Sequence, residues 1–444
     1  MKNGVQTMRR TARWIVGNYI YYISLAIIGL FFLFLIILIK SKATVINHTG
    51  PLLFAYTILI TTFELSRLIA AIFYNNEHHI THAESLVARR EDYEPRASFV
   101  IPCYNEGEAI EKTITKCFEA DYPRNKLEVI VVNDGSTDNT YEVLHRLKNT
   151  KFPELIIIDF KKNKGKRHAM YEGFKKANGE IVVQLDSDSY IVPETFRELI
   201  DPFRNEEIGA VCAHADPENA DENFLTKMQT AYYFVSFRVL KAAESSFFTV
   251  FCCSGCSSAY RRSLVVPILD SWINEKFLSL PVTWGDDRAL TNWVIKLDRK
   301  TIYTNKAKAF TICPNTLKKL LKQQVRWKKG WLVNSIFASK FILKKQLFVA
   351  LTYFFPLIFI TILAPFMALK ALFYNTLVHQ VAPWYYLLGV FLIAALVTVF
   401  YRFVERKNKY WPYVFAWSTL NMFILSFVLF YAVLSIQNRK WGTR

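Results

Sequence analysis

The sequence predicts an α/β domain placed between α-helical transmembrane segments, with amphipathic interfacial helices beside it. Three observations support this fold class. Short apolar strands alternate with helical patterns in residues 83–316, both ends of the 444-residue chain carry apolar runs long enough to cross a bilayer, and residues 317–345 are strongly basic. The expected organisation is an N-terminal membrane region at residues 1–82, the α/β domain at 83–316, the amphipathic helices at 317–345 and a C-terminal membrane region at 346–444.

The composition excludes several classes of protein. A chain that is 52% hydrophobic with membrane-length runs is no ordinary cytosolic enzyme, disordered chain or disulfide-stapled secreted module. The formal charge of +18 suits anionic partners such as nucleic acid, phosphorylated substrates or anionic lipid. The 7 cysteines are odd in number and form no regular framework, which favours a reducing compartment.

The two membrane regions are predicted from their apolar runs. About 20 helical residues span a hydrocarbon core of ~30 Å. Residues 17–39 carry no charge and residues 51–74 carry two, so two transmembrane helices are expected in the N-terminal region. Cations before the first span place the N-terminus and the central domain on the cytoplasmic side of the plasma membrane. About three more spans are expected in the C-terminal region, at 347–369, 382–400 and 411–436.

The basic stretch at residues 317–345 interleaves Lys and Arg with Leu and Trp and contains no acid. This pattern predicts amphipathic helices that lie in the cytoplasmic membrane interface and contact lipid. A nucleic-acid patch is the alternative, but direct attachment to a membrane span argues against nucleic acid as a partner.

The central stretch reads as a parallel sheet with helical crossovers. Helical spacing is seen at 108–119 and from residue 139 onward. Ligands bind at the carboxyl ends of the strands in such sheets, and Glu106, Asp134 and Asp186 follow strand ends. The expected strands are 97–102, 127–132, 155–158 and 180–185.

Asp186-Ser-Asp188 directly follows the last of these strands. A period of two puts both carboxylates on one side, where they would repel each other unless a cation joined them. Hard ions such as Mg²⁺ or Mn²⁺ take carboxylate oxygens and often retain phosphate ligands. The alternative is a solvated loop or a helix cap, which the buried strand and the neighbouring acids disfavour.

Short motifs follow one another along the chain: IPCYNE at 101–106, NDGS at 133–136, GKR at 165–167, DSD at 186–188, GDDR at 285–288 and QQVRW at 323–327. Each motif is weak alone, but their order is specific. In these motifs the chain resembles family 2 glycosyltransferases of the membrane-integrated, processive kind, in particular hyaluronan synthases and chitin-oligosaccharide (N-acetylglucosaminyl) synthases. The resemblance implies a GT-A fold, which is Rossmann-like, and a nucleotide-sugar donor.

The resemblance also implies roles at the donor. Tyr104 and Glu106 would contact the uracil region, and Asp134 the base or ribose. Lys166 would approach the pyrophosphate or uridine, and Asp186 the ribose. The remaining member of the DSD motif, Asp188, would hold the divalent ion on the diphosphate, where metal and cations can stabilise the leaving group.

The resemblance implies that Asp287 is the general base, with Asp286 supporting it and Arg288 contacting substrate. An acceptor hydroxyl must lose a proton as it attacks the anomeric carbon, and a positioned carboxylate can take that proton. The same acids also suit the start of a helix, and both interpretations can hold together.

The resemblance places the acceptor at two further segments. Ser254 and Gly255 lie in a turn whose small residues would let backbone approach a sugar. In the QQVRW motif, Gln323 would bind substrate, Arg326 would meet the diphosphate and Trp327 would lie beneath the acceptor sugar. A membrane-anchoring Trp and a headgroup-binding Arg are the alternative there.

A zinc or redox role for the single CxxC at 253–256 is disfavoured because no second pair exists.

The predicted function is inverting polymerisation of a β-linked, N-acetylglucosamine-containing polysaccharide, like hyaluronan, from UDP-sugars, with transfer of the growing polymer through the membrane. UDP-N-acetylglucosamine is the expected donor, and the hyaluronan likeness alone implies UDP-glucuronic acid as a second. Alternatives are a chitin-oligosaccharide or poly-N-acetylglucosamine synthase and a transferase acting on a lipid phosphate. A transporter or receptor with a nucleotide-sensing domain is a different class, disfavoured because the chain shows no internal repeat.

Overall fold

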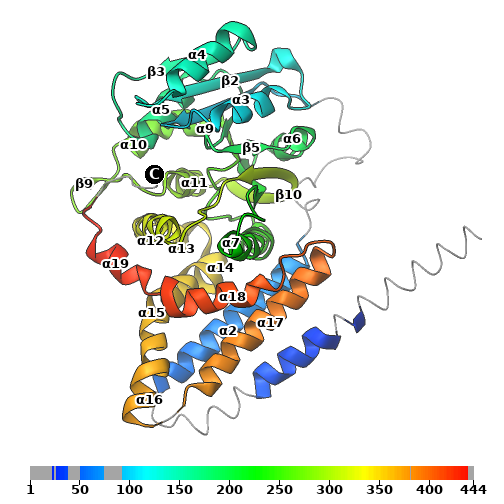
Figure 1. Ribbon diagram of the computed structural model, residues 1–444, viewed down its shortest axis with the longest axis vertical. Helices are drawn as coiled ribbons and strands as arrows, with labels where there is room; N and C mark the ends of the chain where they lie inside the picture. The colour runs from blue at the N-terminus through cyan, green and yellow to red at the C-terminus, as the bar shows by residue number, and fades with distance from the viewer. Residues whose placement is uncertain (1–22, 25–26, 39–50, 75–92, 381, 439–444) are drawn as a thin grey trace, which may run out of the picture. The chain divides into compact units, whose positions relative to one another are not determined.

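The computed structural model describes residues 23–24, 27–38, 51–74, 93–380 and 382–438 (Figure 1). The chain divides into two compact units, one of Met1–Leu68 with Phe359–Ser426 and one of Ile69–Ile358 with Phe427–Arg444. Every residue of the candidate active site lies in the second unit. The boundaries expected at residues 82, 316 and 345 stay predictions.

The second unit is built on an eight-stranded sheet of order β3-β2-β1-β4-β7-β6-β10-β5. The four strands expected from the sequence are confirmed, and they pair in parallel as β3-β2-β1-β4. The other half of the sheet is mixed, because β7 runs antiparallel to both β4 and β6 and β5 runs antiparallel to β10. The strands are β1 Ala97–Cys103, β2 Leu127–Asn133, β3 Ile156–Asp159, β4 Ile181–Gln184, β5 Ser189–Ile191, β6 Ile208–Pro217, β7 Ser258–Arg261 and β10 Lys300–Thr311.

Both faces of the parallel half are covered by helices. Every residue of β1 is buried, and successive side chains alternate between the two faces. Phe99 and Ile101 join a core with α3 and α6, whereas Val100 faces α5. A Cβ at Gly173 of α5 would lie 2.4 Å from Val100, so helix and sheet approach more closely than a side chain allows. The helices are α3 Ile110–Phe118, α4 Thr140–Thr150, α5 Lys166–Lys176 and α6 Phe196–Ile200.

The remaining elements of this unit frame the carboxyl end of the sheet. A small hairpin, β8 and β9, precedes α11, and two α-helices occupy the basic stretch, as expected. The first of them, α12, begins where the Thr316 hydroxyl accepts a hydrogen bond from Lys319 N. Their contact with lipid stays a prediction. The elements are α7 Phe224–Phe234, η5 Val235–Lys241, α8 Ala242–Ser245, α10 Leu269–Ile273, β8 Lys276–Phe277, β9 Leu280–Pro281, α11 Asp286–Lys296, α12 Leu317–Ser339 and α13 Ile342–Lys345.

Four helices among the described residues are long and apolar enough to cross a membrane. They correspond to four of the five expected spans. Of the fifth, expected at residues 17–39, a shorter apolar helix at Ile27–Leu38 is described, and the rest of that prediction lies outside the described residues. The span expected at 347–369 continues to Val378 and contains a π-helical segment, η7, at Ala350–Phe354. The four helices are Pro51–Ile72 (α2), Leu347–Val378, Trp384–Val404 (α17) and Tyr413–Leu434.

Candidate active site

The GKR and DSD motifs meet at the carboxyl end of β4. The Lys166 ammonium donates a hydrogen bond of 2.5 Å to the Asp186 carboxylate. Burial would lower the pKa of Lys166, but Asp186 and the acids of the GDDR motif raise it overall. The lysine therefore stays protonated in a site where several carboxylates converge.

Asp134 connects the NDGS loop to the loop that precedes Lys166. Its two carboxylate oxygens accept hydrogen bonds from Lys164 N at 2.7 Å and Gly165 N at 2.8 Å. Burial raises the pKa of Asp134 above that of an ordinary aspartate, although both backbone donors lower it. Two segments expected to bind the donor are thereby held in one arrangement.

Tyr104 and Glu106 lie on the loop that follows β1, beside the NDGS loop. Asn105 adopts a left-handed φ of 55°, and its backbone N donates to the Ser136 hydroxyl at 3.0 Å. Glu106 N donates to the Thr140 hydroxyl at 2.9 Å. The Tyr104 side chain remains 44% exposed, which leaves its ring available for stacking.

Asp188 lies two residues after Asp186, between β4 and β5. One of its oxygens accepts a hydrogen bond from the Ser189 hydroxyl at 3.2 Å. Within the described residues, no group of three or more His, Cys, Asp or Glu side chains could hold a metal ion by itself. The donor set instead fits a hard divalent ion that takes one or two carboxylates and completes its coordination with phosphate and water.

The expected base, Asp287, lies in the first turn of α11. Its Oδ2 accepts hydrogen bonds from Gly255 N at 3.2 Å and from the Cys252 thiol at 3.6 Å. Its Oδ1 accepts Arg288 N at 2.8 Å. Helix α11 begins at Asp286, as the second interpretation expected, and a neighbouring loop orients the Asp287 carboxylate. The role of Asp287 as the base stays a prediction.

Ser254 and Gly255 form the turn that joins the base to the donor side. Gly255 O accepts Asp186 N at 3.0 Å, while Gly255 N donates to Asp287. A Cβ on Gly255 would lie 2.9 Å from the Gln184 amide and 3.0 Å from the Asp186 carboxylate, so a side chain there would require both groups to move. The neighbouring Ser254 contributes its carbonyl, which accepts the Ser258 hydroxyl at 2.7 Å.

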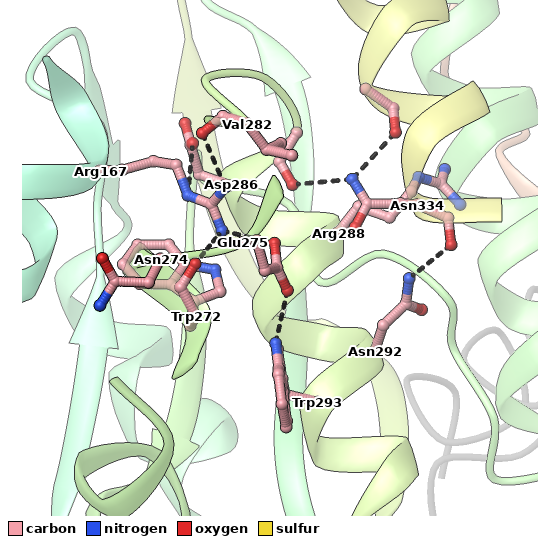
Figure 2. A network of polar contacts seen from close by, with 12 residues as sticks. Arg167, Trp272, Asn274, Glu275, Val282, Asp286, Arg288, Asn292, Trp293 and Asn334 are labelled. Carbon is pink, nitrogen blue, oxygen red and sulfur yellow. Dashed lines mark hydrogen bonds and ion pairs between the residues drawn. The ribbon is translucent and has the colours of Figure 1, made fainter. Parts of the chain in front are cut away.

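Arg167 is a site residue to which the sequence assigned no role. Its guanidinium is 4% exposed, donates to Val282 O at 2.9 Å and Trp272 O at 2.8 Å, and pairs with Glu275 at 2.8 Å (Figure 2). Its Nε lies 3.7 Å from the Asp286 carboxylate. Burial raises the pKa of Asp286, and Lys166 and Arg167 oppose that rise. The sequence showed Arg167 only as the second cation of the GKR motif. Its role could not be predicted because its partners lie more than a hundred residues further along the chain.

Helix α12 brings the QQVRW motif to the same cluster. Burial lowers the pKa of Arg326, whereas the charges of Asp186, Asp286, Asp287 and Asp188 act to raise it. The Trp327 ring lies 6.5 Å from that of Tyr232 between centroids. Gln323 is half-buried on the same helix.

A backbone contact fixes α12 against the GDDR loop. Gly285 has a left-handed φ of 67°, and a Cβ on Gly330 would lie 2.9 Å from Gly285 Cα. The Asn334 amide donates to Gly330 O at 2.9 Å, and Asn292 donates to Asn334 O at 3.2 Å (Figure 2). The basic helix is therefore packed directly on the loop that carries the expected base.

The structure thus gathers Lys166, Asp186, Gly255, Asp287 and Arg326 into one site. Asp188 and Asp286 belong to it through Arg326, and Asp134 joins it through the loop before Lys166. All seven cysteines are free, and Cys253 and Cys256 are buried in the turn. The arrangement can bind an anionic group between cations and present a carboxylate as a proton acceptor.

Comparisons with known proteins agree with this geometry. Glycosyl transferase family 2 matches residues 98–268. The chain is 30% identical over 395 residues to a hyaluronan synthase of Streptococcus pyogenes, covering 88% of this chain and 90% of that protein. It is 27% identical over 395 residues to an N-acetylglucosaminyltransferase of Azorhizobium caulinodans, covering 88% and 96%.

A solved structure agrees at the level of the fold. The mannosyltransferase PcManGT from Pyrobaculum calidifontis, in complex with GDP-Man and Mn²⁺, matches with a TM-score of 0.60 and 22% identity, covering 88% of this chain and 100% of that one. The fold and the site define a glycosyltransferase with a GT-A domain and apolar helices suited to a membrane. The chain belongs to glycosyl transferase family 2, which confirms the family, fold and enzyme class predicted from its motifs.

Proposed function

We propose that this enzyme is a processive, inverting glycosyltransferase that polymerises a β-linked, N-acetylglucosamine-containing polysaccharide from UDP-sugars and passes it across the plasma membrane. Its catalytic domain would face the cytoplasm, where nucleotide sugars are available. The observation that carries the proposal is the position of Asp287, which Gly255 joins to Asp186 and the Lys166 side chain.

The donor would bind at the carboxyl ends of β1, β2 and β4. Tyr104 offers an exposed ring for the uracil, and the Asp134 contacts hold the loop beneath the ribose. Lys166 and Arg326 supply positive charge where the diphosphate departs. A divalent ion, Mg²⁺ or Mn²⁺, held by Asp188 would neutralise further charge on that leaving group.

The acceptor would be activated by Asp287. A hydroxyl placed beside this carboxylate loses its proton as its oxygen bonds to the anomeric carbon, while the bond to the diphosphate breaks on the opposite face of the sugar. This single displacement inverts the anomeric configuration. Gly255 N and Arg288 N hold the carboxylate in place, so the base is oriented before the acceptor arrives.

Processive synthesis is supported by the acceptor side of the site. Trp327 and Arg326 lie on a helix that packs on the base loop, so the acceptor platform and the base are parts of one rigid arrangement. Similarity to hyaluronan synthase favours UDP-N-acetylglucosamine with UDP-glucuronic acid as a second donor. Similarity to an N-acetylglucosaminyltransferase supports the alternative of a chitin-oligosaccharide or poly-N-acetylglucosamine synthase.

The decisive experiment is incubation of purified protein with single and paired UDP-sugars, followed by analysis of the product. A long polymer formed only from UDP-N-acetylglucosamine with UDP-glucuronic acid would support the hyaluronan-like product. A polymer formed from UDP-N-acetylglucosamine alone would support the alternative. One sugar attached to a lipid phosphate would overturn the proposal of processive synthesis.

A further inference from the structure

A buried contact connects one of the candidate membrane helices to the loop that orients Asp287. We refer to residues 251–256 as the acceptor loop. The Tyr353 hydroxyl, in the π-helical segment of helix Leu347–Val378, donates to the Glu244 carboxylate. The other oxygen of Glu244 accepts Phe251 N, the first residue of the acceptor loop, at 3.1 Å. One carboxylate therefore bridges the membrane helix and the loop.

Ring packing reinforces this bridge. The Phe251 ring is stacked on Tyr353, with centroids 5.6 Å apart and planes 6° apart. Phe354 contributes a second ring at 5.2 Å from Phe251. Tyr353 is 2% exposed and Glu244 is 9% exposed, so their hydrogen bond is shielded from water.

The acceptor loop carries the constraint onward to the base. Lys241, at the end of the π-helical segment η5, donates to Cys252 O. Cys253 N donates at 3.0 Å to the Thr291 hydroxyl of α11, and Gly255 N donates to Asp287. The loop is thus fixed to the catalytic helix at one end and to the membrane helix at the other. π-helical turns such as η5 and η7 are frequently found at functional sites.

We propose that Tyr353 and Glu244 are positioning residues that tie the orientation of Asp287 to helix Leu347–Val378, so that efficient transfer requires this helix to hold the acceptor loop. The proposal rests on the proposed function, in which the growing product passes from the acceptor side of the site across the membrane. A shift of this helix would reach Asp287 through Glu244, Phe251 and Gly255. Each transfer would then be favoured when the helix holds the loop in place.

The test compares Tyr353→Phe and Glu244→Gln with their double variant. Tyr353→Phe keeps the stacked ring and removes the hydroxyl donor, while Glu244→Gln keeps an acceptor for Tyr353 and weakens the contact with Phe251 N. Each single variant should lower kcat for UDP release by roughly tenfold and shorten the product. UDP affinity and the thermal unfolding midpoint should stay near wild type. The double variant should lose less than the product of the two single losses, because both residues act through one contact.

Tyr374→Phe is the matched control, because Tyr374 belongs to the same helix and is 52% exposed. It should leave turnover and product length unchanged. Unaltered turnover in Tyr353→Phe, strictly multiplicative losses in the double variant, or loss of UDP affinity would overturn the proposal. Failure of the proposed function is distinguishable: wild-type protein would then make no polymer, while the ratio of variant to wild-type UDP release would still report on the contact.

Discussion

In the proposed mechanism, the chemistry depends most directly on Asp287. Its carboxylate has two backbone donors and one thiol donor, and among the described residues no cation lies at hydrogen-bond distance from it. A base of this kind contributes typically about 10²–10⁴-fold to a proton-transfer step. We expect Asp287→Asn to abolish measurable sugar transfer while leaving UDP affinity nearly intact, as determined by calorimetry and product analysis.

The control for that substitution is Asp298→Asn, which changes a 65%-exposed carboxylate beyond the end of α11. It should retain wild-type transfer. If Asp287→Asn lost UDP affinity as well, Asp287 would belong to the donor site, and the assignment of the base would be wrong.

Asp134 gives the site a predicted pH dependence. Above its raised pKa the carboxylate is ionised and accepts both Lys164 N and Gly165 N. Because that pKa lies above the usual value, the group takes up a proton at a higher pH than an ordinary aspartate does. The protonated form loses one acceptor, so the donor KM should rise as pH falls through this pKa. The free energy of unfolding should increase as pH falls through this pKa, although donor binding weakens. A buried carboxylate with a raised pKa costs folding free energy only while it is ionised.

The measurement is the donor KM across the acidic range for wild type and Asp134→Asn. The asparagine has no proton to gain, so its KM should be higher than that of wild type at neutral pH and flat toward acid. An identical acidic rise in both proteins would assign the titration to another group.

If Asp188 holds a divalent ion as proposed, the reaction should depend on that ion. Since the described residues offer no three-ligand cluster, the ion should exchange readily and depend on the diphosphate for its remaining ligands. We expect EDTA to stop turnover and added Mn²⁺ or Mg²⁺ to restore it. Asp188→Asn should raise the metal concentration needed for half-maximal UDP release. Full activity in the chelator would remove Asp188 from this role.

Among the elements, the segment from α10 to α11 is held together by one buried side chain. Arg167 of α5 contacts the carbonyls of Trp272 and Val282 and two carboxylates, while stacking on the Trp272 ring at 4.5 Å (Figure 2). A buried cation removed from such a set leaves its acids uncompensated. The hairpin and the first turn of α11 therefore depend on a residue of the GKR motif.

We expect Arg167→Met to destabilise the fold by about 3–5 kcal/mol, because the remaining buried carboxylates lose their partner. The thermal unfolding midpoint of the purified protein should fall accordingly. Arg146→Met is the control, since the Arg146–Glu111 pair is 56% and 42% exposed and such surface pairs are worth about 0–1 kcal/mol. Equal shifts in both variants would contradict the assignment of Arg167 to the packing of this segment.

For the molecule as a whole, the sequence predicted the features that rest on local pattern. Apolar runs located β1 to β4, and the parallel arrangement followed from the helices between them. The convergence of the acids at the strand ends was also predicted, because the carboxyl ends of parallel strands meet at one edge of the sheet. Four of the spans were visible because each is one long apolar helix.

The features that could not be predicted depend on contacts distant in sequence. Strand β7 has four residues, including Ser258 and Arg261, and lacks an apolar run, yet it joins β4 to β6. Its place is set by pairing partners and not by its own composition. The Glu244–Tyr353 contact likewise joins residues 109 positions apart, each unremarkable in its local pattern.

The contact of Gly285 with Gly330 limits how this enzyme can evolve. A side chain at either position would enter the backbone of the other segment, at 3.0 Å or less from a Cα atom. A second substitution therefore cannot relieve the clash, since both residues are already glycine and neither has a side chain that could be shortened. A library randomised at both codons and selected for polymer on the cell surface should return glycine at the two positions together.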